Sequence, residues 1–145
     1  MIACDDSRLV VCYYLPIPHP GFDGTNPLLV SKSKTESGVC VLEADLLAVL
    51  FGHPNDEALS GHPLYERGLG PYGTYEVLNS SWIRQMEARN RVAFPETKDW
   101  LSSSRHVVVC FHDTTLEFVA SSWKHRVIHG TVHSVFAQAI TAMSQ

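Results

Sequence analysis

The sequence predicts an α+β fold, in which a curved antiparallel sheet of about five to seven strands is packed by two main helices. Three observations lead to this prediction. Residues 105–130 alternate apolar and polar side chains, residues 132–143 repeat apolar side chains at helical spacing, and residues 8–15 form an apolar run rich in β-branched and aromatic residues. The length of 145 residues indicates a single domain spanning 1–145.

Residues 105–121 are predicted to form a hairpin that turns at Asp113-Thr114. In this register the two strands meet in three apolar pairs: Phe111 with Leu116, Val109 with Phe118, and Val107 with Ala120. All six side chains share one face, because side chains alternate along a strand. A second turn at Ser121-Ser122 is expected to begin a third strand over 123–129.

Two main helices are predicted, one over about 80–90 and one over 132–143. The first has N-cap candidates at Asn79, Ser80 and Ser81, and the second has Thr131. The stripe of the second helix is Val132, Val135, Phe136, Ala139, Ile140 and Met143. We expect it to cover the apolar face of the hairpin, where each buried side chain is worth ~1.5–3 kcal/mol before entropy is counted.

The remaining predicted elements are short. Residues 38–42 and 72–78 are interpreted as strands, and 43–51 as a short helix, because Ala and Leu favour that state. Residues 16–27 hold a Pro-rich loop, and 53–70 form a long loop with about one helical turn.

Composition limits the function. The net charge of −4 and the pI near 6.0 argue against a nucleic-acid partner. No apolar run reaches the ~20 residues needed to cross a bilayer, and the N-terminus does not resemble a signal peptide. The four cysteines have no metal-site spacing and are interpreted as free thiols, mostly buried. A cytoplasmic protein without a cofactor is therefore expected.

Two Gly-His-Pro segments contain His53 and His62, with Asp56 and Glu57 between them. Two imidazoles and a carboxylate form the ligand set of many metal sites, so His53 and His62 are candidate metal ligands. The alternative is that Gly and Pro shape turns while the histidines bond to backbone carbonyls.

His112 and Glu117 are the candidate catalytic pair. In the predicted register they are diagonal neighbours on one face, where a carboxylate would raise the basicity of the imidazole for general acid–base work. The alternative is a solvated cross-strand ion pair.

The first hypothesis for function is a non-catalytic binding protein, with a small molecule or a protein as ligand in a cleft on the sheet. The first alternative is an enzyme that uses His112 with Glu117, or His53 with His62. The second is an acidic inhibitor or antidote protein that binds a basic partner. A free strand edge also makes a homodimer possible.

Overall fold

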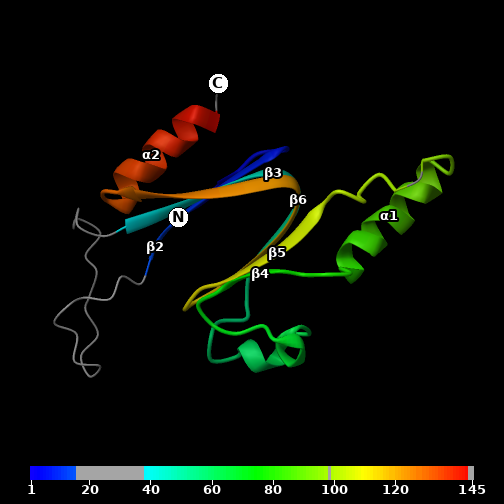
Figure 1. The fold of residues 1–145 in the computed structure, drawn as a ribbon, viewed down its shortest axis with the longest axis horizontal. Helices are drawn as coiled ribbons and strands as arrows, with labels where there is room; N and C mark the ends of the chain where they lie inside the picture. The colour runs from blue at the N-terminus through cyan, green and yellow to red at the C-terminus, as the bar shows by residue number, and fades with distance from the viewer. Residues whose placement is uncertain (16–37, 98, 144–145) are drawn as a thin grey trace. The chain divides into compact units, whose positions relative to one another are not determined.

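The computed structural model describes residues 1–15, 38–97 and 99–143. Within these residues the strands form one antiparallel sheet, which is not closed and has the order β1-β2-β3-β6-β5-β4. The elements, drawn in Figure 1, are β1 (Ile2–Cys4), β2 (Arg8–Tyr14), β3 (Gly38–Gly52), β4 (Thr74–Glu76), α1 (Ser81–Ala93), β5 (Arg105–Cys110), β6 (Thr115–His129) and α2 (Val132–Met143). The predicted α+β class, with about five to seven strands and two main helices, is confirmed by the six strands and two helices of the described residues. The predicted Pro-rich loop over 16–27 lies outside the described residues.

The chain divides into two compact units. The first unit comprises Met1–Asp45 and Trp123–Gln145, and the second comprises Leu46–Ser122. The long strands β3 and β6 each contribute residues to both units. No helix among the described residues is long and apolar enough to cross a membrane.

In the first unit, strands β1 and β2 form a hairpin with Ile2 opposite Val11. The turn is held by the Asp5 carboxylate, which accepts the backbone N–H groups of Ser7 at 2.8 Å and Arg8 at 2.7 Å. An Asp that bonds to the backbone two and three residues ahead is a common way to reverse a chain. Strand β1 was not predicted from the sequence.

Helix α2 belongs to the same unit and buries Val132, Val135 and Ala139 of the predicted stripe. Its N-cap is Thr131, whose side chain accepts the N–H of Ser134 at 3.2 Å, as predicted. The prediction for its packing partner was wrong. The helix packs against alternate residues of two strands of its own unit, namely Val10, Cys12, Val39 and Val41. These four side chains share one sheet face, because they alternate along β2 and β3.

Two strands are longer than predicted. Strand β3 continues through 43–51, so the predicted short helix is wrong, and β6 continues through Ser121-Ser122 without a turn. Pairing with neighbouring strands outweighs the weak helix preference of Ala and Leu over 43–51. Ala44 and Leu46 are buried while Asp45 and Leu47 are exposed, which is the alternation of a strand.

The hairpin of β5 and β6 forms in the second unit, with a register two residues from the predicted one. Val109 lies opposite Leu116 rather than Phe118, and Val107 lies opposite Phe118 rather than Ala120. The turn spans 111–114 and is closed by the N–H of Phe111 and the carbonyl of Thr114 at 2.9 Å. The pair Asp113-Thr114 lacks the glycine that favours a two-residue turn. A shift of two residues keeps every side chain on its predicted face.

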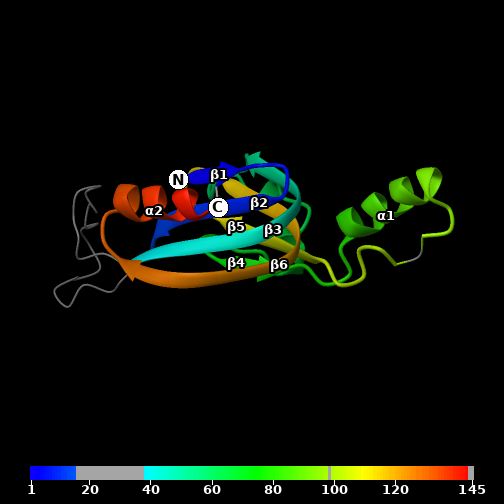
Figure 2. The same cartoon turned by 90° about the horizontal axis from the view of Figure 1, so that it is seen from above.

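Helix α1 follows β4 in the second unit and extends away from the strands of that unit (Figure 2). Its N-cap is Ser80, one of the three predicted candidates. None of its residues is fully buried, and Trp82, Ile83, Met86 and Asn90 are half-buried. Val92 is 86% exposed.

Candidate functional site

The candidate site lies on one face of the sheet in the second unit. The strand registers place Tyr75 of β4 beside Val108 of β5, and Val108 beside Glu117 of β6, in one row. His106 lies opposite Val119, so it is the diagonal neighbour of Glu117 on the same face. Two ionisable side chains therefore share an otherwise apolar surface.

The segment between β3 and β4 covers this face. Leu59 and Leu69 are buried against Val108 and Cys110 in one hydrophobic cluster. The hydroxyl of Thr115 donates to a backbone carbonyl at the start of the segment, that of Pro54, at 2.8 Å. The predicted long loop thus contains two short 3-10 turns, η1 (Leu59–Gly61) and η2 (Tyr65–Arg67). The buried Leu59 lies in η1, and the buried Leu69 follows η2.

His62 enters the site from the end of η1. Its backbone is extended, with ψ 135°, which is the conformation favoured before a proline such as Pro63. The side chain is buried, and its Nε2 lies 3.1 Å from Oε1 of Glu117. Its Nδ1 accepts the backbone N–H of Leu64 at 3.1 Å. Both ring nitrogens are therefore engaged.

His106 reaches the other oxygen of the same carboxylate. Its Nε2 lies 3.0 Å from Oε2 of Glu117, and its Nδ1 lies 2.8 Å from the hydroxyl of Ser80. That hydroxyl also accepts the N–H of Ile83 at 3.2 Å as the N-cap of α1. The ring of Trp82 meets the imidazole edge-on, with ring centroids 5.2 Å apart. The start of α1 thereby fixes the orientation of His106.

The electrostatic environment keeps Glu117 ionised. The hydrogen bond from His106 lowers the pKa of the Glu117 carboxyl, and the bond from His62 lowers it further, against the opposing effect of burial. The side chain is 21% exposed, so the carboxylate can be reached from outside. A carboxylate with a lowered pKa is a weak general base.

The three side chains border a pocket with a volume of about 830 Å³, which falls in the range of ligand sites. Its apolar walls come from Leu50, Pro63, Leu64, Leu69, Tyr75, Val77, Leu78 and Trp82. Its polar lining comes from His62, His106 and Glu117, together with Arg67, Glu76, Asn79, Ser81, Arg84 and Gln85. An apolar cavity with a few convergent polar groups is the usual form of a small-molecule site.

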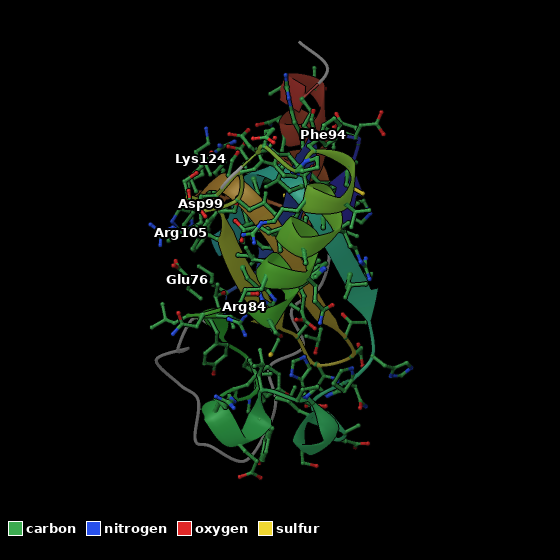
Figure 3. All side chains as sticks on the ribbon, turned by 90° about the vertical axis from the view of Figure 1, so that its right-hand side faces the viewer. Glu76, Arg84, Phe94, Asp99, Arg105 and Lys124 are labelled. Atoms are coloured by element: carbon green, nitrogen blue, oxygen red, sulfur yellow. The ribbon has the colours of Figure 1, made fainter. Side chains whose placement is uncertain are left out.

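Charged groups at the rim of the pocket are partly satisfied by protein partners. Glu76 lies side by side with Arg105 in Figure 3, and their charged atoms are 2.9 Å apart. The guanidinium of Arg84, labelled in the same figure, donates to the backbone carbonyl of Asn79. Arg67 and Arg84 are both exposed, whereas the side chain of Glu117 is only 21% exposed.

The structure separates the two members of the predicted catalytic pair. His112 is 71% exposed in the hairpin turn, where its Nδ1 lies 2.8 Å from Asp113 and its Nε2 lies 3.9 Å from Asp56. These contacts raise the pKa of His112, with the Asp113 hydrogen bond as the main cause. Glu117 instead contacts His62 and His106.

The two predicted metal ligands have different surroundings. His62 is buried against Glu117, whereas His53 is exposed. Across residues 1–15, 38–97 and 99–143, the structure contains no group of three or more His, Cys, Asp or Glu side chains arranged to hold a metal ion. Each oxygen of Glu117 faces a different imidazole, and the ring nitrogens do not converge with the carboxylate on one point where a metal ion could bind.

Sequence reasoning did not assign a role to His106, and it assigned Ser80 only a capping role. The signal for His106 was present, because it alternates onto the same face as Glu117 in the hairpin. A turn placed one residue earlier, over 111–114, would have made them neighbours. No sequence signal paired Ser80 with His106, which are 26 residues apart.

Ser80, His106 and Glu117 follow the order of nucleophile, base and carboxylate in serine hydrolases, but with the two ring nitrogens exchanged, because here Nδ1 faces the serine and Nε2 the carboxylate. Two observations argue against a nucleophilic role. Ser80 is only 5% exposed and does not line the pocket. Its hydroxyl oxygen is also the acceptor that caps α1 through Ile83. The serine therefore serves to hold the helix and the imidazole together.

Scans against known protein families, curated proteins and solved structures found no match for this chain.

Proposed function

We propose that this chain is a non-catalytic binding protein whose ligand is a small molecule held in the pocket around Glu117. The observation that carries the proposal is a carboxylate fixed by two imidazoles at a pocket of about 830 Å³ with mainly apolar walls. Fixed polar groups in an apolar cavity orient a ligand, because only matching groups compensate for the loss of water.

The same geometry favours binding over acid–base chemistry. All four ring nitrogens of His62 and His106 already have protein partners, so a proton transfer would first break one of those bonds. Glu117 has a lowered pKa and holds its proton poorly near neutral pH. The alternative pair of His112 with Glu117 would require two groups that the structure engages elsewhere. The hypothesis of an acidic inhibitor stays a prediction.

A ligand screen by two-dimensional NMR tests the proposal. A library of small molecules with apolar bodies is added to the ¹⁵N-labelled full chain, and binders are expected to shift the backbone signals of Tyr75, Trp82, His106 and Glu117. Failure of the whole library to shift these signals would contradict the proposal.

A blocking variant adds specificity to this screen. Gln85 lines the pocket from the exposed side of α1, so Gln85→Trp should obstruct the pocket without disturbing the core. The matched control is Gln138→Trp on the exposed side of α2. The control should keep the shifts and the blocking variant should lose them. Equal binding to both variants would show that the ligand binds elsewhere.

A further inference from the structure

The hydrogen bonds of His62 determine where its proton lies. A backbone N–H can only donate, so the bond from Leu64 requires that Nδ1 of His62 carry no proton. The single ring proton must then reside on Nε2, where it is donated to Oε1 of Glu117 at 3.1 Å. His62 is thereby held in one neutral tautomer and brings no positive charge to the carboxylate.

His106 is arranged in the same way. The ionised Glu117 can only accept, so Nε2 of His106 is the donor in their bond. On the other side of the ring, Nδ1 of His106 lies 2.8 Å from the hydroxyl of Ser80, which can donate to it, so that nitrogen needs no second ring proton to be hydrogen-bonded. In that tautomer the second imidazole also contributes an N–H dipole to the carboxylate and not a formal charge.

With both imidazoles in these tautomers, Glu117 carries a negative charge that its two neighbours stabilise but do not neutralise. The charge of Glu76, the other carboxylate in the lining, is balanced by Arg105 at 2.9 Å. A carboxylate has about four acceptor positions, and the two imidazoles occupy one on each oxygen of Glu117. Acceptor capacity and charge remain available toward the pocket.

We propose that the ligand of this pocket is an organic cation, a primary or secondary ammonium with an apolar body, whose N–H groups bind to the Glu117 carboxylate. This inference rests on the proposed function. An ammonium would complete the unused acceptor positions and neutralise the charge, and charge-assisted bonds of this type are strong where water is partly excluded. Tyr75 and Trp82 in the walls offer aromatic surface, which suits both an apolar body and a cation.

The two arginines in the lining do not oppose this assignment. Arg67 and Arg84 are exposed to water, which screens their charges, and Arg84 already donates to the carbonyl of Asn79. The covered charge is that of Glu117, and covered charges interact more strongly than exposed ones.

Three probes with the same ring and different head groups test the inference, namely benzylamine, benzyl alcohol and benzoate. Isothermal titration calorimetry at neutral pH should give benzylamine an affinity for the wild-type chain at least about tenfold above the other two. Glu117→Gln should remove this preference. Glu96→Gln, which deletes the same charge at an exposed position outside the pocket, should keep it.

The outcomes separate this inference from the proposed function. Equal or tighter binding of benzyl alcohol or benzoate would overturn the cation assignment and leave a small-molecule site in place. No binding of any of the three probes would overturn the cation assignment as well, while the library screen decides the proposed function independently. If Glu117→Gln fails to fold, the order of the three affinities in the wild-type chain still decides whether the pocket prefers a cation.

Discussion

His106 and Glu117 are diagonal neighbours across the pairing of β5 and β6, with His106 Nε2 3.0 Å from Glu117 Oε2. The strand register alone brings these two side chains into contact. His62 arrives at the other carboxylate oxygen from a separate segment, 55 residues away in sequence. The site thus combines a rigid pair on the sheet with a third group supplied by the segment over 53–70.

Replacing the carboxylate should destabilise the fold. Glu117→Gln keeps the shape, but its amide nitrogen would face one imidazole N–H and leave a buried donor without an acceptor. We expect a loss of about 1–3 kcal/mol in the free energy of unfolding, measured by urea denaturation. Glu96→Gln should stay within about 0.5 kcal/mol of the wild type. Equal stability of the two variants would show that the imidazoles do not depend on the charge.

The difference in free energy of unfolding between the wild type and Glu117→Gln should depend on pH. The reason is the lowered pKa of Glu117, which is caused first by the hydrogen bond from His106. A carboxyl group with a lowered folded pKa stabilises the fold above its unfolded pKa, and the contribution is lost as the pH falls through the folded pKa. The gap between wild type and Glu117→Gln should therefore be wide above the ordinary value of 4.5 and should narrow below it. Urea denaturation over a series of pH values measures this stability difference. A difference that widens toward acid pH would contradict the lowered pKa of Glu117.

Ser80→Ala should remove the cap of α1 and the partner of His106 Nδ1 together. The cap alone is worth about 0.5–2 kcal/mol, and the imidazole nitrogen would lose its donor as well. Thermal unfolding followed by circular dichroism measures the loss. Ser81→Ala, at the exposed neighbouring position, should change the midpoint far less. Similar effects of both substitutions would refute the assigned role of Ser80.

The hairpin turn offers a test of local electrostatics. The pKa of His112 is raised mainly by the hydrogen bond from its Nδ1 to Asp113, and also by Asp56. Asp113→Asn should bring the His112 pKa down toward its ordinary value of 6.5, as followed by NMR titration of the ring signals. Asp6→Asn, at an exposed position in the first unit, should leave it unchanged. An unchanged His112 pKa in Asp113→Asn would show that the bond does not form in solution.

The packing of α2 predicts a further stability effect. Val135 is buried in the first unit against β2 and β3, so Val135→Ala should cost about 1–3 kcal/mol through lost burial and a cavity. His133→Ala on the exposed side of the same helix is the control. Urea denaturation of both variants should show a clear loss for the first alone, and a loss of the same size for the second would argue against this packing.

The sequence was sufficient for the fold class, the helix over 132–143, the strand over 8–15 and the sharing of faces in the hairpin. These features depend on periodicity, which is a local property of the chain. It was insufficient for 43–51, where the helix preference of Ala and Leu conflicted with strand pairing that involves distant residues. The packing partner of α2 was missed for the same reason, because it is set by β2 and β3.

The candidate site was predicted in part. Glu117 and His62 were both selected from the sequence, but each was given a different partner from the one the structure shows. The two-residue shift in register exchanged His112 for His106 as the diagonal neighbour of Glu117. The position of the turn decides this exchange, and Asp113-Thr114 is a weak indicator of where the chain turns, because neither residue is Gly. The contact between His62 and Glu117 depends on how a long segment folds back, which no local pattern encodes.

The most direct test of the central claim is the tautomer of the two site histidines, read from long-range ¹⁵N–¹H correlations of the imidazole rings at neutral pH. The bond from Leu64 predicts that His62 carries its proton on Nε2 and none on Nδ1, and the cation proposal predicts the same tautomer for His106. A proton on Nδ1 of either ring would contradict the account, because Glu117 would then lose a donor or gain a formal positive charge beside it.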